Sequence, residues 1–396
     1  MLFRFLRRLI SEVSPWLLLK AAYLWVFKGM LAVRAYRRRV ARGELFPPFL
    51  FLALTDNCNL RCHGCWIQRR GQPRELRPEQ IDRLIDEGKR KRSYFYTLLG
   101  GEPLMYPDLW SIPERHPDCY FQVISNGMFF DEPTAARIRR LGNVTPLVSL
   151  DGREAENDRR RGEGVYAEAV AGMERLRRQR VLFGVATTVT GENIDEVMSD
   201  DYVAELIERG AMYLWFYVFR PVGPNPSPEL CVGREGMLRV RRRLLELRRR
   251  HPIIIIDTYW NARGEAVCPA ALGLGFHIGP AGDIEPCPPL SFAREHIGDH
   301  GGALFETINN SHYLRRFQRF VNERTRGCVI LERPDELIEF LRDSQARDTS
   351  GRDAYAELAA SERRTSHHLP GEEVPEDYWV YRFLKRQLFF GMGGYG

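Results

Sequence analysis

FLFLALTDNCNLRCHGC, residues 49–65, joins an apolar run to three closely spaced cysteines. Cys58, Cys62 and Cys65 are separated by three residues and then by two. In a chain without a secretory signal, clustered cysteines indicate a metal or iron–sulfur site before they indicate disulfides. A structural zinc site with His63 as fourth ligand is the alternative. Zinc sites usually combine two C-x2-C pairs, however, and no second pair follows here.

The composition is that of a folded protein. The 396 residues are enough for two or three domains, and they are equally compatible with one α/β barrel that carries additions. Apolar residues make up 44% and charged residues 28%, so the chain can bury a sizeable core and is not disordered. Eight cysteines are too few for a disulfide scaffold.

Positive charge is concentrated at the N-terminal end. Residues 1–45 contain ten basic and two acidic residues, a net charge of +8, whereas the whole chain carries +6. The remaining residues therefore sum to −2. An enzyme that acts on nucleic acid usually spreads positive charge over its body, so no nucleic-acid partner is expected.

The segment Met1–Val40 is rich in Leu, Phe, Trp and Tyr. Lys20 and Lys28 interrupt it, so no uncharged run approaches the ~20 residues that a membrane-spanning helix requires. Charges inside the apolar region also argue against a secretory signal. The pattern favours an interfacial helix or helix pair; the alternative is an amphipathic helix packed on the barrel or on a partner chain. The interfacial residues would be Trp16, Tyr23, Trp25, Phe27 and the basic run Arg37-Arg38-Arg39.

From Pro48 onward, short apolar runs alternate with longer helical patterns, which predicts parallel βαβ units. The strand candidates are residues 49–55, 94–99, 119–125, 145–150, 182–189 and 212–219. The helix candidates are residues 78–91, 107–116, 132–141, 165–180, 194–209 and 234–250. Six such units predict an α/β fold, a partial (β/α)6 barrel rather than a closed eightfold one. The basic runs at 89–92, 159–161, 175–180 and 241–250 are interpreted as mostly solvated outer faces without a function.

Polar residues and glycines follow the predicted strands, at the edge where α/β folds bind ligands. The second strand ends in Gly100-Gly101-Glu102-Pro103. Paired glycines allow close backbone approach to a ligand, and a carboxylate beside them can accept hydrogen bonds from an ammonium group. Later strands end in Ser125-Asn126-Gly127, Ser149-Leu150-Asp151-Gly152, Asn193 and Phe219–Gly223. Each alone is typical turn chemistry, but their succession indicates a binding edge.

The spacing C-x3-C-x2-C, with G-G-E-P about 35 residues downstream, resembles the motifs of radical S-adenosylmethionine (SAM) enzymes. The resemblance covers roughly residues 48–330 and implies that Cys58, Cys62 and Cys65 hold a [4Fe–4S] cluster with one open iron. It also implies SAM contacts from Gly100, Gly101, Glu102, Pro103, Ser125, Asn126, Ser149 and Asp151. Gly64 is a departure, since an aromatic residue usually precedes the third cysteine in this family. Trp66 is the candidate to pack near the adenine instead.

A second group of cysteines follows the predicted barrel. Cys268 precedes the stretch Gly282–Cys287, and Cys328 comes after a longer gap. This pattern resembles the start of the auxiliary-cluster domain called SPASM, and its shortened "twitch" version is the better match, because the dense later cysteine run is absent. The resemblance implies an auxiliary [4Fe–4S] cluster on Cys268, Cys287 and Cys328, with Cys231 as fourth ligand or a site open to substrate. The alternative is three buried free thiols.

The remaining segments are predicted to be peripheral. The polar stretch Arg347–Glu373 is interpreted as a linker, with His367 and His368 at its surface. Residues 378–390 are aromatic and basic, and would lid the barrel or join the N-terminal helix at a membrane. Cys119 is expected in the core. The predicted units are a basic amphipathic segment (1–47), the barrel (48–260), an auxiliary-cluster region (261–345), and a linker with a tail (346–396).

The resemblance implies that a reduced cluster cleaves SAM to methionine and a 5′-deoxyadenosyl radical, which removes hydrogen from a substrate. A flavodoxin- or ferredoxin-type reductant would supply the electron. Three hypotheses stay open for the use of the radical. The amphipathic ends favour a membrane lipid or isoprenoid, the SPASM-like pattern favours a peptide, and a non-catalytic Fe–S carrier would leave the Gly100–Pro103 motif unexplained. The expected location is the cytoplasm, with peripheral contact to the inner face of the cell membrane. No residue that completes substrate chemistry can be assigned.

Overall fold

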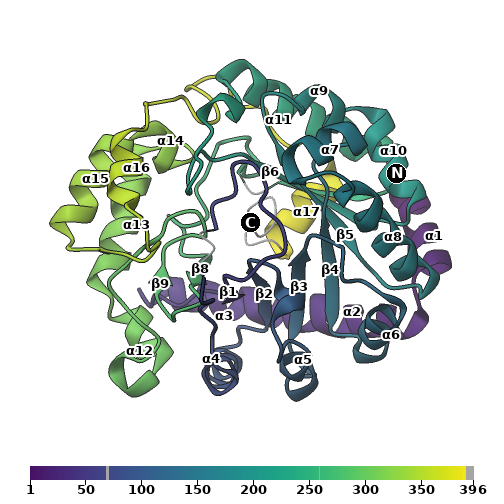
Figure 1. Ribbon diagram of the computed structural model, residues 1–396, viewed down its shortest axis with the longest axis horizontal. Helices are drawn as coiled ribbons and strands as arrows, with labels where there is room; N and C mark the ends of the chain where they lie inside the picture. The colour runs from purple at the N-terminus through teal and green to yellow at the C-terminus, as the bar shows by residue number, and fades with distance from the viewer. Residues whose placement is uncertain (68–70, 258, 389–396) are drawn as a thin grey trace.

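The structure is a computed structural model that describes residues 1–67, 71–257 and 259–388. Its centre is a nine-stranded sheet in the order β7-β6-β5-β4-β3-β2-β1-β8-β9, with helices around its outside (Figure 1). The neighbouring strands are parallel, except that β8 and β9 are antiparallel. The six predicted strands are present as β1 (Phe49–Thr55), β2 (Phe95–Gly100), β3 (Tyr120–Ser125), β4 (Val144–Ser149), β5 (Gly184–Val189) and β6 (Tyr213–Val218). The predicted partial α/β barrel is therefore confirmed.

Three strands of the sheet were not predicted. They are β7 (Ile254–Asp257), β8 (Gly275–Ile278) and β9 (Ile284–Glu285). None is longer than four residues, which is too short for a period-2 pattern to stand out. The strand β8 pairs with β1 and brings the C-terminal part of the chain beside the cysteine loop.

The barrel helices mostly follow the prediction. They are α4 (Pro78–Arg90), α5 (Ser111–Arg115), α6 (Glu132–Leu141), α7 (Glu154–Arg161), α8 (Val165–Arg178), α9 (Ile194–Val197), α10 (Asp200–Glu208) and α11 (Arg234–Arg250). The helix expected at 194–209 is two helices, because the Ser199 side chain accepts a hydrogen bond from the Tyr202 backbone N–H and caps a new one. The helix expected at 107–116 is reduced to α5. The helix α7 was not predicted, since its mostly charged residues form no apolar stripe.

The N-terminal segment forms α1 (Leu2–Glu12), α2 (Pro15–Ala21), the π-helix η1 (Ala22–Lys28) and α3 (Gly29–Ala41). Contrary to the expectation from its charges, Pro15–Ala41 is one helix that is long and apolar enough to cross a membrane, by length and composition alone. In the structure it runs beneath the strands (Figure 1). Its Trp25 ring contacts Tyr120 and Tyr213, which begin β3 and β6, at 5.2 and 6.4 Å. It therefore covers the amino ends of the strands.

The C-terminal part contains α12 (Leu304–Asn309), α13 (His312–Arg324), α14 (Val329–Glu332), α15 (Pro334–Asp343), α16 (Ala354–Ala359) and α17 (Trp379–Gln387), with the short strands β10 (Phe292–Ala293) and β11 (Arg347–Asp348). The stretch that was interpreted as a linker is held against the rest of the C-terminal part by strand pairing and hydrogen bonds. Its β11 pairs with β10, and the Thr349 hydroxyl donates to the buried Glu285 carboxylate. Phe389 and Phe390, part of the aromatic and basic tail, lie outside the described residues.

The helix α17 covers β7, the edge strand of the barrel. The Ile255 N–H of β7 donates to the Tyr381 hydroxyl at 2.7 Å, which satisfies an edge group that would otherwise be unpaired. Beneath α17, the buried Arg248 of α11 bonds both Asp257 and Glu376. Arg241 and Arg248 were both interpreted as solvated, and the structure corrects this, because both side chains are buried against β7 and the C-terminal segment.

Candidate active site

The cysteine loop lies at the carboxyl end of β1, between the ends of β2 and α7. The Leu60 N–H points at the Cys58 sulfur at 3.4 Å, and the His63 N–H donates to the Arg160 carbonyl at 2.7 Å. Burial raises the pKa of the Cys58 thiol to about 11, and the nearby Glu102, Cys62 and Cys65 raise this pKa further. The three thiols therefore share one small region of the loop.

The surroundings of the three thiols are compatible with the ligation of an iron–sulfur cluster. Within the part of the chain that the structure describes, no three His, Cys, Asp or Glu side chains converge closely enough to hold one metal ion. The Leu60 N–H at Cys58 and the Arg161 guanidinium near Cys65 each partly offset the rise in thiol pKa that burial causes, and the thiolate is the form that ligates iron. His63, the ligand of the zinc alternative, bonds the Ser227 hydroxyl at 2.7 Å instead.

The structure explains the unusual Gly64. Its φ is +67°, and a Cβ on it would lie 2.6 Å from the Phe219 ring, which follows β6. An aromatic side chain before Cys65 would therefore collide with an aromatic ring that already occupies this space. Trp66 turns the other way and packs edge-on against His277 at 5.6 Å.

Gly100 and Gly101 hold the end of β2 against the root of the cysteine loop. The Gly101 N–H donates to the Thr55 carbonyl at 2.7 Å, and the Glu102 N–H donates to the Asn57 carbonyl at 2.8 Å. A Cβ on either glycine would lie within 2.2 Å of one of these two carbonyl oxygens. Glycine is required at both positions because the two chain segments touch through their backbones.

The Glu102 carboxylate is buried beside this contact. It accepts hydrogen bonds from the Leu104 and Asn126 N–H groups at 3.1 and 2.8 Å. Burial raises its pKa to about 7, and the two N–H groups lower the pKa by less than burial raises it. Pro103 begins the short 3-10 helix η2 (Pro103–Met105) that positions this carboxylate. Glu102 can therefore change its charge near neutral pH and pair with a cationic ligand group.

The ends of β3 and β4 supply the next polar groups. The Asn126 amide donates to the Asn59 side chain at 2.8 Å and so joins β3 to the cysteine loop. The Ser125 hydroxyl accepts from the Gly127 N–H at 3.1 Å, and Ser149 ends β4 in a buried position. The structure thus brings these predicted residues to one edge.

The Asp151 carboxylate is fully buried and bonded to protein groups. It accepts hydrogen bonds from the Thr188 N–H at 2.7 Å and from Arg160 and Arg161. These positive partners hold its pKa at about 2 in spite of burial. Asp151 therefore fixes the two guanidiniums at the edge of the site.

Arg160 and Arg161 are functional candidates that the sequence analysis missed. Residues 159–161 were interpreted as a solvated run, which is wrong for these two side chains. Arg161 is close enough to Cys62 and Cys65 that the thiols and Asp151 raise its pKa. The position of this run in the sequence could have identified the two arginines as candidates, because the run begins only ten residues after the end of the fourth strand.

The second cysteine group also gathers in space. Burial raises the pKa of the Cys287 thiol well above its ordinary value, and the neighbouring Cys268 and Cys328 add to the rise. Burial raises the pKa of the Cys231 thiol, and the nearby Cys328 adds to this rise. Arg220 lies near Cys328 and Cys231, and both thiols raise its pKa in spite of the opposing effect of burial. Cys119, by contrast, lies alone in the core as expected.

His367 and His368 are buried, so the prediction of surface histidines is wrong. The His367 ring packs 4.9 Å from Tyr259 and bonds Ser366, whose hydroxyl accepts from the Cys328 N–H at 3.0 Å. Burial keeps the pKa of His367 well below its ordinary value. His368 accepts the Ala266 N–H through Nε2 at 2.8 Å. The pair therefore packs behind the second cysteine group.

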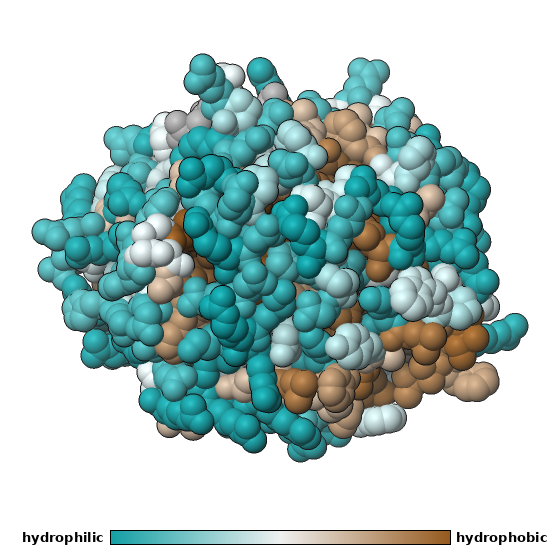
Figure 2. All heavy atoms as spheres, turned by 90° about the horizontal axis from the view of Figure 1, so that it is seen from below, coloured by the Kyte–Doolittle hydropathy of each residue, from teal (hydrophilic) through white to brown (hydrophobic). Residues whose placement is uncertain are grey.

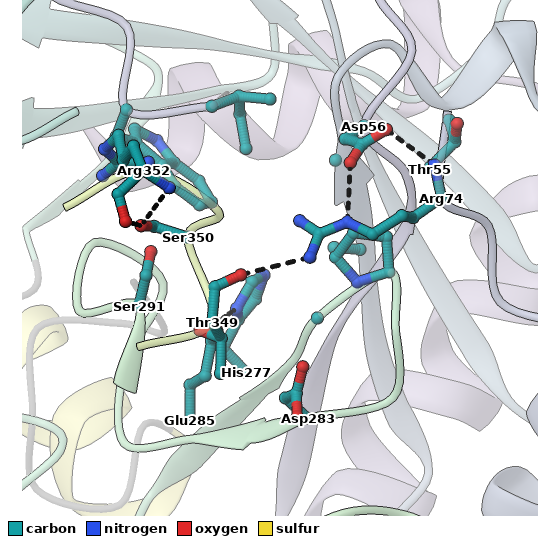
Figure 3. A pocket seen from close by; sticks show the side chains of 16 residues that line it. Thr55, Asp56, Arg74, His277, Asp283, Glu285, Ser291, Thr349, Ser350 and Arg352 are labelled. Atoms are coloured by element: carbon teal, nitrogen blue, oxygen red, sulfur yellow. Dashed lines mark hydrogen bonds and ion pairs between the residues drawn. The ribbon is translucent and has the colours of Figure 1, made fainter. Parts of the chain in front are cut away.

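A pocket connects the first site with the C-terminal region (Figure 3). One wall contains Thr55, Trp66 and Gly100 of the barrel, and the other contains His277 and Glu285 of β8 and β9. His277 Nδ1 lies 2.5 Å from Glu285, so Nδ1 donates, and the buried Nε2 has no hydrogen-bond partner among the residues that the structure describes. Sequence reasoning missed both residues because β8 was not predicted.

Comparisons with known proteins agree with this geometry. Residues 52–201 match the family model of the radical SAM superfamily. Over these residues the chain therefore contains a radical SAM superfamily domain.

Curated relatives match parts of the chain. Mycofactocin maturase MftC of Mycolicibacterium smegmatis is 28% identical over 264 residues, which are 62% of this chain and 66% of that protein. The AdoMet-dependent heme synthase of Methanosarcina barkeri is 30% identical over 178 residues, 43% of this chain and 51% of that protein. The chain thus spans about half to two thirds of these relatives. Streptococcus suis SuiB bound to its precursor peptide SuiA has a similar fold, with a TM-score of 0.61, 14% identity, and 75% and 72% of the two chains covered.

Proposed function

We propose that this protein is a radical SAM enzyme that modifies a peptide. The observation that carries the proposal is the joining of the cysteine loop to the Gly100-Gly101-Glu102 motif by backbone hydrogen bonds. When bound on Cys58, Cys62 and Cys65, a [4Fe–4S] cluster would supply the electron that cleaves SAM into methionine and a 5′-deoxyadenosyl radical. On this proposal residues 48–260 form the SAM-cleaving barrel, the reaction takes place in the cytoplasm, and a flavodoxin- or ferredoxin-type protein delivers the electron.

The chain's own residues would bind and orient SAM. Glu102, whose pKa is about 7, would ionise beside the methionyl ammonium group and hold it next to the cysteine loop. Ser125, Asn126 and Ser149 would bind the polar atoms of SAM, and the half-buried Arg161 would offset the negative charge of the thiolates. Phe219 or Trp66 would pack on the adenine.

Cys268, Cys287 and Cys328 would hold an auxiliary cluster in residues 261–345, with Cys231 as the fourth ligand. Three thiols near one half-buried guanidinium, that of Arg220, support this assignment, because buried free thiols have no need of a cation beside them. The resulting SPASM- or twitch-like region would contact substrate in the pocket between β1 and β8.

A peptide substrate is favoured over a lipid or isoprenoid. MftC is named a maturase, and the SuiB structure contains a precursor peptide. The exposed apolar residues that favoured a lipid lie at the amino ends of the strands, opposite the cysteine loop. A seven-residue strand separates the two ends by roughly 20 Å. An electron carrier is disfavoured, since it has no use for an ionisable carboxylate such as Glu102.

The test is anaerobic reconstitution with iron and sulfide, followed by SAM and a strong reductant. Formation of 5′-deoxyadenosine, with about eight irons per chain, is expected. Short peptides encoded beside the gene are then added, and mass spectrometry is used to detect a change in their mass. Bound zinc, or iron without SAM cleavage, would overturn the proposal. Cleavage with modification of extracted lipids instead of peptides would overturn its substrate class.

A further inference from the structure

The helix Pro15–Ala41 has apolar residues on both of its faces. The inner face packs against the barrel, where Leu24 and Ala32 join a core cluster with Phe49. A helix on the surface of a soluble barrel normally turns polar residues outward. The helix α4 does so, since Glu79, Arg83 and Arg90 are exposed or half-buried on it. An apolar outer face therefore requires an explanation.

The outer face, called the basal face here, consists of Trp16, Leu19, Tyr23, Val26, Phe27 and Met30. They recur every three or four residues, with Val26 and Phe27 adjacent, which places them on one side of the helix. The exposed fractions run from 37% for Met30 to 69% for Leu19. The neighbouring α1 adds Phe3, Leu6 and Ile10. Among the described residues, ten of fifteen exposed large apolar side chains lie within residues 1–41. They gather on one side of the molecule when it is seen from below (Figure 2).

Basic residues border the basal face. The same helical stripe continues into Arg34, Arg37 and Arg38, and all three are exposed. Residues 1–45 contain only two acids; one of them, Glu12, pairs with Arg8 at 2.9 Å. The surface thus combines an apolar stripe, aromatic residues and a positive border. This combination complements a lipid interface with anionic headgroups.

We propose that the basal face docks this protein on the surface of an anionic lipid bilayer, with the helix Pro15–Ala41 lying in the plane of the interface. A second copy of the chain is a poorer occupant, since a self-contact would place two strongly positive segments, residues 1–45 of each copy, against each other. Spanning the membrane would strip Leu24 and Trp25 from the barrel contacts that they make. Interfacial docking keeps these contacts.

Docking on this face fixes the orientation of the active site. The basal face covers the amino ends of the parallel strands, and the cysteine loop lies at their carboxyl ends. The mouth of the site therefore points away from the lipid. Membrane binding would localise the enzyme without supplying its substrate, so the inference stands apart from the choice of substrate.

Vesicle flotation with the full chain tests this inference. Wild-type protein is expected to float with phosphatidylcholine vesicles that contain phosphatidylglycerol, and less with phosphatidylcholine alone or in high salt. The double variant Leu19→Glu, Phe27→Glu should bind at least about tenfold more weakly, because two charges would enter the apolar interface. The variant Arg34→Gln, Arg38→Gln should lose the preference for the anionic lipid.

The control Leu369→Glu changes a leucine that is 45% exposed in the C-terminal part, and it should float like wild type. All variants should form 5′-deoxyadenosine as wild type does, since none touches the cysteine loop. The inference is overturned if wild type does not float with anionic vesicles, or if the control loses binding equally. A wild-type dimer in light scattering that Leu19→Glu dissociates would assign the face to a second copy instead.

Discussion

The two ends of the parallel sheet are built from opposite chemistry. The carboxyl end buries the carboxylates of Glu102 and Asp151, the second paired with the half-buried Arg161, and brings backbones into contact through glycine. The amino end is filled by aromatic rings such as Trp25 and Phe95. Burying charge is unfavourable unless each group is paired. The difference therefore separates an end organised for binding from an end organised for stability, as in other parallel barrels.

The largest effect is expected from a thiol at the carboxyl end. Cys62→Ala should lower 5′-deoxyadenosine formation by ~10³-fold or more, because the three thiols act as one unit. The circular dichroism spectrum and the melting temperature should change little, since Cys62 is only partly buried. Full SAM cleavage by this variant after reconstitution would show that the cysteine loop does not hold the cluster that cleaves SAM.

A second thiol variant separates the two cysteine groups. Cys268→Ala should lower the iron content from about eight to about four per chain, since one auxiliary cluster is lost. Cys119→Ala is the matched control, because Cys119 is buried and belongs to neither group. It should keep all the iron. Equal iron content in wild type and Cys268→Ala would contradict the auxiliary cluster. Cys268, Cys287 and Cys328 would then be buried free thiols.

A smaller, pH-dependent effect is expected at Glu102. Its folded pKa of about 7 means that SAM affinity should fall as pH drops below 7, where the carboxyl group loses its charge. Glu102→Gln should bind SAM about 10- to 100-fold more weakly at pH 8. It should also lose this pH dependence. Equilibrium dialysis of the reconstituted protein measures both quantities, and parallel pH profiles would refute the assigned role.

The same residue contributes to stability with a defined sign. Because the pKa is raised above the ordinary value of 4.5, the folded state binds more protons than the unfolded state between pH 4.5 and 7. The contribution of Glu102 is therefore fully present below pH 4.5 and is lost as the pH rises through 7. Asp151, with a pKa of about 2, has the opposite sign and loses its contribution as the pH falls through 3.8 toward 2.

The parts predicted from sequence are those with local patterns. The cysteine loop and Gly100–Pro103 could be recognised because their spacing is short and follows strands of ordinary length. Arg160 and Arg161 could not, since only the tertiary structure shows that α7 directs them to Asp151. His277 was missed because β8 is four residues long and pairs with β1 across more than 200 residues. Long-range pairing of this kind has no signature in sequence.

The smallest effect on chemistry is expected at the amino end. Trp25→Ala removes a ring that packs on Tyr120 and Tyr213, and should lower the free energy of unfolding by about 2–4 kcal/mol. Chemical denaturation measures this loss. At a temperature where the variant is still folded, SAM cleavage per iron-loaded molecule should equal that of wild type, since Trp25 packs at the amino ends of the strands and the cysteine loop lies at their carboxyl ends. A drop in cleavage without a drop in stability would show that the amino end also serves the reaction, and the division between the two ends would fail.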